Sequence, residues 1–215
     1  AETVAALVED GMRLGLGTGR TMELVLAALA RRMAGALRFT GVATSEATAA
    51  RARELGIVLA DADAPCDLAL DGADEIERGS LRLIKGGGGA LLREKIVAES
   101  ARRFVVVADA GKLVDRLGAF ALPVEVVAFG HAATTRRVAA LGGAPGLRMR
   151  EGAPVVTDNG NLVLDCPGFA PIRDPHTLER RLRAIAGVVV VGLFLLPVER
   201  AVIGYADGRV EVLRP

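Results

Sequence analysis

Hydrophobic and polar positions alternate along the first half of the chain in short blocks that switch between two periods. Compact apolar blocks predict strands, and the longer amphipathic stretches between them predict helices. The expected strands are 12–16, 36–43, 57–60, 68–70 and 104–108, and the expected helices are 22–33, 47–55 and 90–102. Strands that alternate with helices in this way indicate βαβ units and a mostly parallel sheet.

The pattern changes after about residue 117. Strands are expected at 122–129, 147–150, 155–156, 162–164 and 188–191, with helices at 132–141 and 175–186. Asn159-Gly160 is a tight-turn signal for a hairpin, and Asp174 with Pro175 is a typical helix start. The order β-α-β-β-α-β is that of a ferredoxin-like module.

The last two expected strands, 201–205 and 210–213, are joined by Asp207-Gly208 and are expected to return to the first domain. The predicted fold class is therefore α/β, with a Rossmann-like, mostly parallel sheet domain and a smaller ferredoxin-like α+β domain. We place the first domain at 1–117 plus 193–215 and the second at 118–192.

Composition excludes several classes of protein. The chain of 215 residues is 51% hydrophobic with a mean hydropathy of +0.37, and disordered chains are poor in apolar residues. It has 27 basic and 26 acidic residues, a net charge of +1, and no basic run longer than two residues. Nucleic acid is therefore not expected as a partner.

The cysteines and the apolar segments bear on the compartment. Cys66 and Cys166 have no CxxC-type spacing, which favours two ordinary reduced thiols over a disulfide or a metal pair. The longest apolar run, 184–198, is shorter than the roughly 18 residues that span a bilayer. Acidic residues within the first ten positions argue against a secretory signal. We expect a cytoplasmic protein without a membrane partner.

Four polar segments, three of them with glycine, follow predicted strands directly: GTGRT, TSEAT, DGADE and ADAGK. Ligands of parallel sheets bind beyond the carboxyl ends of the strands. The sequence therefore predicts an active site at one rim of the sheet, formed by these segments.

The segment from Asp71 to Lys95, DGADEIERGSLRLIKGGGGALLREK, carries most of the chemistry. Carboxylates transfer protons, a lysine and backbone amides hold anions, and glycines let a ligand approach the main chain. The segment holds three carboxylates without an obvious structural partner, a lysine, four glycines and a glutamate on the next predicted helix: Asp71, Asp74, Glu75, Lys85, Gly86 to Gly89 and Glu94. This set suits proton transfer on a small anionic substrate.

GLGTGRT, at 15–21, joins a strand to a helix. Amides at a helix N-terminus bind phosphate, and Thr18 and Thr21 add hydroxyl groups. A dinucleotide fingerprint would need glycine where the chain has Arg20, and a merely structural glycine turn stays open as well.

Other interpretations of the remaining motifs are weaker. DGADE is too short for a calcium loop, although a solvated acidic turn is possible, and KGGGG precedes a helix rather than joining domains, which disfavours a flexible linker. The only histidines, His131 and His176, lie outside any polar cluster and are expected at the surface or at helix ends. No serine-hydrolase triad or metal site is expected.

Several motifs resemble, in order, the type A family of ribose-5-phosphate isomerases: GLGTGRT, TSEAT, DGADEI, KGGGGALLREK, ADAGKLV and LPVEVV. The resemblance extends to VTDNGNLVLD and GVVVVGLF in the second module. It implies interconversion of D-ribose 5-phosphate and D-ribulose 5-phosphate in the non-oxidative pentose phosphate pathway, through an enediolate and without cofactor or metal. It also implies a homo-oligomer, a dimer or a tetramer.

The resemblance implies a role for each matching residue. Glu94 is the base that moves the proton between C1 and C2, Asp71 and Asp74 serve the sugar oxygens and ring opening, and Lys85 stabilises the enediolate oxygen. The substrate-binding set is Thr18, Gly19, Arg20, Thr21, Gly72, Ala73, Gly86, Gly87, Gly88 and Lys112. The family usually has serine in place of Arg20, so the role of that arginine stays open.

Two further function classes are weighed against the isomerase. A non-catalytic sugar-phosphate sensor would need a DNA-binding element, for which the chain has no spare segment, and a nicotinamide-dependent oxidoreductase is disfavoured by Arg20. Lysine usage adds to the isomerase interpretation, because the three lysines of the chain, Lys85, Lys95 and Lys112, all fall within the isomerase-like motifs while every other basic residue is arginine. Lys85 and Lys112 are expected to face the ligand, and Lys95 to form a structural ion pair.

Overall fold

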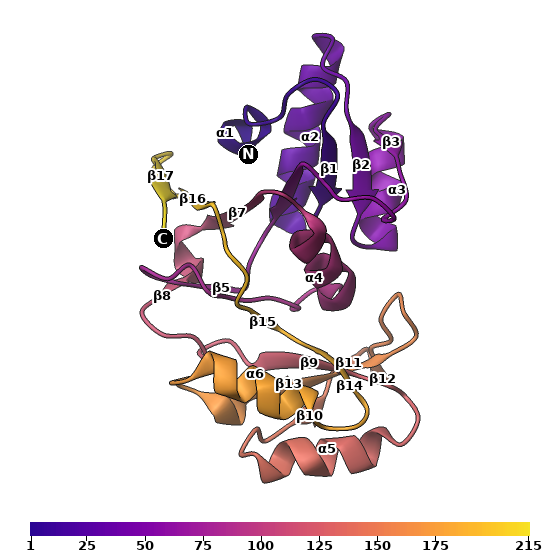
Figure 1. The fold of residues 1–215 in the computed structure, drawn as a ribbon, viewed down its shortest axis with the longest axis vertical. Coiled ribbons are helices and arrows are strands. Elements are labelled where there is room, and N and C mark those ends of the chain that lie inside the picture. Colours follow the sequence, from indigo (N-terminus) through magenta and orange to yellow (C-terminus); the bar gives the residue numbers. More distant parts are fainter. The chain divides into compact units, whose positions relative to one another are not determined.

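A seven-stranded, mostly parallel sheet organises the first part of the computed structural model, which describes all 215 residues (Figure 1). Its strands are β1 (Arg13–Leu16), β2 (Thr40–Ala43), β3 (Val58–Leu59), β4 (Leu68–Asp71), β7 (Phe104–Asp109), β16 (Arg200–Gly204) and β17 (Val210–Leu213). Their order is β17-β16-β7-β4-β1-β2-β3, and only β17 is antiparallel to its neighbour. The predicted Rossmann-like sheet, including the return of the C-terminal strands, is confirmed.

Helices cover both faces of this sheet. Successive side chains of a strand point to opposite faces, so a buried strand needs cover on both. The helices are α1 (Glu2–Ala5), α2 (Arg20–Ala34), α3 (Glu46–Glu54) and α4 (Leu91–Ser100). Leu14 and Leu16 pack with apolar residues of α1 and α2 in one buried core. Gly15, between them on β1, faces α4 instead, where a Cβ atom would lie 2.4 Å from Cγ1 of Val97. The glycine thus lets α4 approach the sheet closely.

An ion-pair cluster joins the N-terminal ends of β7 and β16. The Arg103 guanidinium donates to both oxygens of Glu199, at 2.6 and 3.2 Å, and Arg200 also donates to this carboxylate. These hydrogen bonds, Arg103 first, lower the pKa of Glu199 from 4.5 to about 2. The parallel pairing of these two strands is therefore supported by charge as well as by the backbone ladder.

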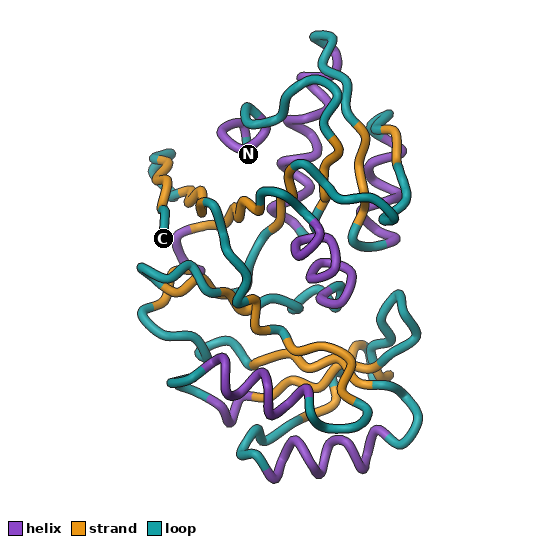
Figure 2. Tube along the Cα trace, viewed as in Figure 1, coloured by secondary structure: helices purple, strands orange, loops and turns teal.

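A second sheet has the order β10-β13-β9-β14, and each neighbouring pair is antiparallel. Its elements, in chain order, are β9 (Leu122–Val126), α5 (His131–Ala140), β10 (Gly146–Leu147), β13 (Leu162–Cys166), α6 (Pro175–Arg183) and β14 (Val188–Val191). Both helices lie on one face, and Val138 of α5 and Leu182 of α6 pack with Val124 and Leu164 of the strands (Figures 1 and 2). The predicted ferredoxin-like module is confirmed.

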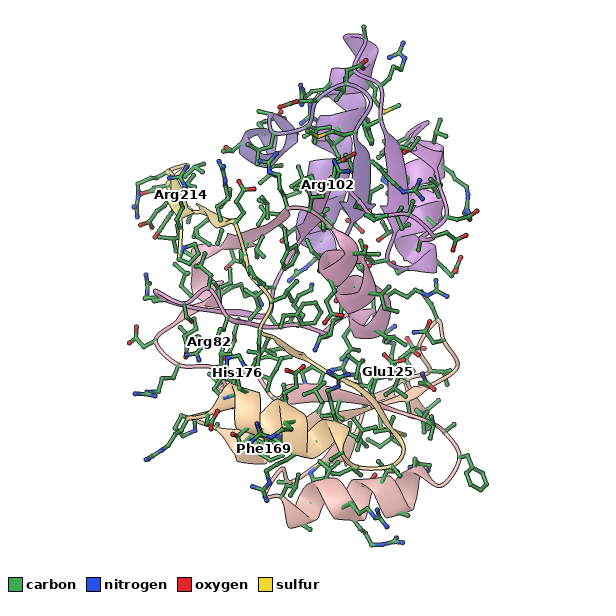
Figure 3. All side chains as sticks on the ribbon, in the orientation of Figure 1. Arg82, Arg102, Glu125, Phe169, His176 and Arg214 are labelled. Carbon is green, nitrogen blue, oxygen red and sulfur yellow. The ribbon has the colours of Figure 1, made fainter.

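Details of this module follow the predicted signals. The Asp174 side chain accepts a hydrogen bond from the amide of Thr177 and caps α6, with Pro175 as the first helical residue. Thr157 and Asn161 pair through a backbone hydrogen bond of 2.8 Å on either side of Asn159-Gly160. His131 and His176 lie in the first turns of α5 and α6, and His176 is exposed (Figure 3).

A third sheet was not predicted from the sequence. It has the order β15-β6-β5-β8 and consists of β5 (Glu75–Glu77), β6 (Leu83–Ile84), β8 (Leu113–Val114) and β15 (Leu193–Phe194), and a separate hairpin pairs β11 (Met149–Arg150) with β12 (Ala153–Pro154). Strands of two or three residues leave no period in the sequence, so only pairing between distant segments creates them. Two short 3-10 helices, Ala110–Lys112 and Pro167–Phe169, complete the elements.

The chain divides into two compact units. Unit 1 comprises Ala1–Ala73, Arg93–Lys112 and Leu196–Pro215, and unit 2 comprises Asp74–Leu92 and Leu113–Leu195. The division differs from the predicted boundaries at residues 74–92, 113–117 and 193–195, which we placed in the first domain and which lie in unit 2. These residues carry β5, β6, β8 and β15, which pair with one another in one sheet. No helix is both long enough and apolar enough to cross a membrane.

Candidate active site

The carboxyl ends of four neighbouring parallel strands of unit 1 carry the predicted polar segments. β7, β4, β1 and β2 are adjacent in the sheet, and ADAGK, DGADE, GTGRT and TSEAT follow them. Because the strands are parallel, their carboxyl ends share one edge. The predicted gathering of these segments at one rim is confirmed for the parts that belong to unit 1.

Asp71 is the last residue of β4 and is only 3% exposed. Its carboxylate lies directly against Gly17, because a Cβ atom on that glycine would be 2.1 Å from Oδ1 of Asp71. The amide of Gly72 donates to the same oxygen at 2.7 Å. Glycine is therefore required at position 17, because a side chain there would overlap the Asp71 carboxylate. The contact holds this carboxylate at the rim.

Thr18 forms part of a hydroxyl network at the same rim. Its Oγ1 lies 2.8 Å from Oγ1 of Thr44, 2.9 Å from Oγ of Ser45 and 3.2 Å from Oγ1 of Thr48. Thr48 in turn donates to the carbonyl of Gly17 at 3.0 Å. The network joins the loop after β1 to the start of α3, so it holds GTGRT and TSEAT in a fixed relation.

The other residues of the phosphate-binding prediction lie at the start of α2. Gly19 is its N-cap, with φ of 110°, and Arg20 and Thr21 are its first two residues. Gly19 and Arg20 are exposed, and Thr21 is half-buried. The amides of this helix end and the Arg20 guanidinium are accessible to an anion.

Glu94 lies in the first turn of α4 and is 5% exposed. Val97, one turn later, is the residue that packs on Gly15 of β1, so Glu94 lies on the sheet-facing side of the helix. α4 leads into β7 through residues 101–103, so its C-terminal end lies near the start of that strand and its N-terminal end lies towards the rim where the parallel strands end. This topology brings Glu94 to the edge that also carries Asp71, while Lys112 ends the 3-10 helix after β7 and is half-buried.

The tetraglycine segment is an ordered turn of unit 2 rather than a linker. The amide of Gly89 donates to the carbonyl of Gly86 at 3.0 Å, and both residues have positive φ, 83° and 113°. The amide of Gly87 donates to Oδ2 of Asp74 at 2.7 Å. A Cβ atom on Gly87 would lie 2.6 Å from Asp74 Oδ1, so glycine at position 87 is what allows this carboxylate to lie against the turn. Gly88, at the tip, is exposed.

Lys85 precedes the glycines and is buried, with 3% of its surface exposed. Its backbone amide donates to the carbonyl of Gly192 at 2.9 Å, and its Nζ lies 5.5 Å from the centre of the Phe194 ring. A Cβ atom on Gly192 would lie 2.4 Å from the Lys85 carbonyl oxygen. Gly192 therefore holds the backbone of Lys85, and Phe194 of β15 lies beside its side chain, contacts that the sequence did not predict.

Glu75 differs from the other acidic residues of DGADE. Its two carboxylate oxygens accept hydrogen bonds from the amides of Gly118 and Phe120, at 2.7 and 2.5 Å, and it is 3% exposed. The sequence shows no obvious structural partner for Glu75, because a partner more than forty residues away cannot be seen in a local motif. Glu75 holds the segment between β8 and β9.

Two other features of unit 2 were missed. Arg148 donates to the carbonyls of Gly86 and Gly87 and pairs with Asp165. Glu125 on β9 is fully buried, and its Oε1 accepts hydrogen bonds from Thr157 and Asn161, each at 2.9 Å (Figure 3). The only sequence signal for the second cluster was an acidic residue within the apolar strand LPVEVV.

No group of three or more His, Cys, Asp or Glu side chains is arranged to hold a metal ion. Both cysteines are unpaired and buried, and burial raises the pKa of Cys66 and raises that of Cys166 to about 12. The chemical groups described above are carboxylates, lysines and backbone amides. The fold and these groups define the class as an α/β enzyme built for acid–base chemistry on a small anionic substrate.

Comparison with known proteins identifies the family. Residues 40–208 match the family model of ribose 5-phosphate isomerase A (phosphoriboisomerase A). The chain is 58% identical to ribose-5-phosphate isomerase A of Roseiflexus sp. (strain RS-1), covering 100% of this chain and 94% of that protein. The chain belongs to the ribose 5-phosphate isomerase A family.

Solved structures agree with this assignment. Ribose 5-phosphate isomerase A from Methanocaldococcus jannaschii superimposes with a TM-score of 0.94 at 38% identity, covering 100% of this chain and 96% of that chain. A D-ribose-5-phosphate isomerase in complex with phospho-erythronic acid gives a TM-score of 0.92 at 35% identity, covering 100% and 97%.

Proposed function

We propose that this chain interconverts D-ribose 5-phosphate and D-ribulose 5-phosphate through an enediolate intermediate. The observation that carries the proposal is Glu94, a buried carboxylate at the rim of the sheet in a chain of the ribose 5-phosphate isomerase A family. An aldose–ketose isomerisation needs one base that serves both C1 and C2, and a fixed carboxylate meets that need. The solved relative with bound phospho-erythronic acid supports a phosphorylated sugar as the substrate.

Glu94 removes the proton from one carbon and returns it to the other. The negative charge that develops on the substrate oxygen is stabilised by the Lys85 ammonium and by the turn Gly86–Gly88, whose exposed Gly88 amide supplies a hydrogen bond. Asp71 and Asp74 serve the sugar hydroxyl groups and ring opening. Their contacts with Gly17 and Gly87 support this assignment because they fix each carboxylate in one position.

The phosphate is bound by Thr18, Gly19, Arg20 and Thr21, with Lys112 as a further cation. Gly72 and Ala73 complete the substrate-binding set through their backbone. The exposed helix end at Gly19 and the half-buried position of Lys112 support this part of the proposal. Arg20, where the resembling family usually has serine, adds a guanidinium that suits a phosphate oxygen.

A glutamine variant tests the base. Glu94→Gln keeps the shape of the side chain but cannot abstract a proton, so kcat for ribulose 5-phosphate formation should fall by about 10²–10⁴-fold with KM nearly unchanged. Glu99→Gln, on the exposed side of the same helix, is the matched control and should retain activity. An E94Q enzyme within tenfold of wild type would remove Glu94 from the role of base.

We also propose a cellular compartment, a pathway and an oligomeric state. We place the reaction in the cytoplasm, within the non-oxidative pentose phosphate pathway, and expect a homodimer or homotetramer. Exposed apolar side chains of unit 2 support self-association, since Phe129 is 94% exposed and Met149 53%. Light scattering of the purified chain at micromolar concentration would measure its molar mass. A monomer mass would contradict the proposed oligomer.

A further inference from the structure

We infer that Arg148, oriented by Asp165, is a positioning residue that fixes the tetraglycine turn so that the Gly88 amide is presented to the substrate anion. The inference deepens the proposed function, on which its catalytic part rests. All the contacts that carry it lie within unit 2.

Backbone hydrogen bonds fix the position of Arg148 independently of its side-chain contacts. It lies between β10 and β11, where its amide donates to the carbonyl of Val163 at 2.8 Å and its carbonyl accepts from the amide of Val155 at 2.9 Å. Both the amide and the carbonyl of Arg148 are therefore hydrogen-bonded. Only 12% of its side chain is exposed.

Asp165 of β13 determines the direction of the guanidinium. Nε of Arg148 donates to Oδ2 of Asp165 at 3.0 Å, and Nη2 donates to Oδ1. A two-point contact of this kind fixes the plane of the guanidinium as well as its position. The remaining nitrogen, Nη1, points to the glycine turn, where it donates to the carbonyls of Gly86 at 2.7 Å and Gly87 at 3.1 Å.

These contacts hold consecutive peptide groups of the turn. The peptide between Gly86 and Gly87 is held at both ends, by Arg148 at its carbonyl and by Asp74 at its amide. The next peptide is held at the Gly87 carbonyl, and its amide belongs to the exposed Gly88. In a trans peptide the C=O and N–H bonds point in opposite directions, so a cation at the Gly87 oxygen directs the Gly88 N–H away from Arg148.

The hydrogen bond from Arg148 to the Gly87 carbonyl also makes the Gly88 N–H a stronger donor. A charge on the carbonyl oxygen polarises the peptide and makes its N–H a better hydrogen-bond donor. Glycine has the largest conformational freedom of any residue, and four in succession would otherwise sample many orientations. A donor that stabilises developing charge acts best when it is already oriented, so the guanidinium keeps the turn ready for the enediolate oxygen.

Arg148→Ala is the principal test, with Arg150→Ala as the matched control. Arg150 lies two residues away, is exposed, and makes the same change in net charge. For R148A we expect kcat to fall about 10- to 100-fold with KM changed less than threefold, part of the 10²–10³-fold that a lost oxyanion donor costs. R150A should match wild type. Ethylguanidinium at millimolar concentration should restore part of the kcat of R148A and leave R150A unchanged.

Hydrogen exchange provides a readout that does not depend on the reaction. Amides of residues 86–89 should exchange faster in R148A than in R150A or wild type, while the strands of unit 2 keep their protection. If R148A does not fold, Arg148→Lys serves instead, because one ammonium group cannot hold Asp165 and both carbonyls together, and it should show the same fall in kcat.

The outcomes separate the two proposals. Wild-type protein without ribose 5-phosphate isomerisation would overturn the proposed function, whereas faster exchange at 86–89 in R148A would still support the positioning role. Active R148A enzyme with kcat within threefold of R150A would overturn the inference alone. A loss of kcat without rescue and without faster exchange in the turn would also overturn it, because the residue would then act on stability only.

Discussion

Glu75→Gln should destabilise the protein although it removes only one charge and almost no volume. Glu75 is 3% exposed, and its two oxygens accept hydrogen bonds from the amides of Gly118 and Phe120 at 2.7 and 2.5 Å. A glutamine retains one acceptor oxygen, and its NH₂ group must face a backbone N–H that is also a donor. One bond to a charged acceptor is lost, and one buried donor is left without a partner.

The magnitude follows from these two terms. A hydrogen bond to a charged group contributes about 1.5–3 kcal/mol, and a stranded buried donor costs about 1–3 kcal/mol. Because the two terms describe partly the same loss, we expect the free energy of unfolding to fall by about 2–4 kcal/mol. That is a large share of the 5–15 kcal/mol typical of a folded protein. The segment cannot easily adjust, because Gly118 has φ of 121° and a Cβ atom there would lie 3.1 Å from Ala170.

Urea denaturation followed by circular dichroism measures this change. Glu151→Gln, an exposed acidic residue of the same unit, is the control and should leave the transition within about 0.5 kcal/mol of wild type. The urea midpoint of E75Q should fall while the slope stays constant, since the surface exposed on unfolding does not change. An E75Q protein as stable as E151Q would refute the assignment of Glu75 as the residue that holds the 118–120 segment.

Three further predictions concern other parts of the chain. Lys85→Arg and Lys112→Arg should each lower kcat/KM at least tenfold, about 1.4 kcal/mol, because a planar guanidinium does not replace a compact ammonium, and equal activity of the arginine enzymes would contradict this. Glu199→Gln should destabilise the protein at neutral pH, and since the folded pKa of Glu199 is lowered to about 2 from 4.5, the difference from wild type in urea titrations should disappear as pH falls from about 4.5 towards 2. A pH-independent difference would exclude the carboxylate charge as its cause. The buried thiols of Cys66 and Cys166, both with raised pKa, should react with a thiol reagent only after denaturation, and rapid labelling of the native protein would contradict their burial.

Features that depend on local periodicity and on short motifs could be predicted from the amino-acid sequence alone. Alternating blocks identified the βαβ units and the ferredoxin-like order, because side-chain spacing reports directly which face of an element is buried. The helix start at Asp174 and the hairpin at Asn159-Gly160 were predicted for the same reason, since caps and tight turns are decided by residues a few positions apart. The motifs around Glu94 and the glycines, taken with the resemblance, led to the family that the comparisons show.

The residues that support those motifs are apparent only in the folded structure. The strands β5, β6, β8 and β15 are too short to leave a period, and they exist because distant segments pair. Glu75 has no obvious partner in the sequence because its amide partners lie more than forty positions away, and Arg148 donates to glycine carbonyls about sixty positions away. A local motif contains the residues proposed to act, whereas the contacts that hold these residues in place form between distant segments, which periodicity and motif spacing do not encode.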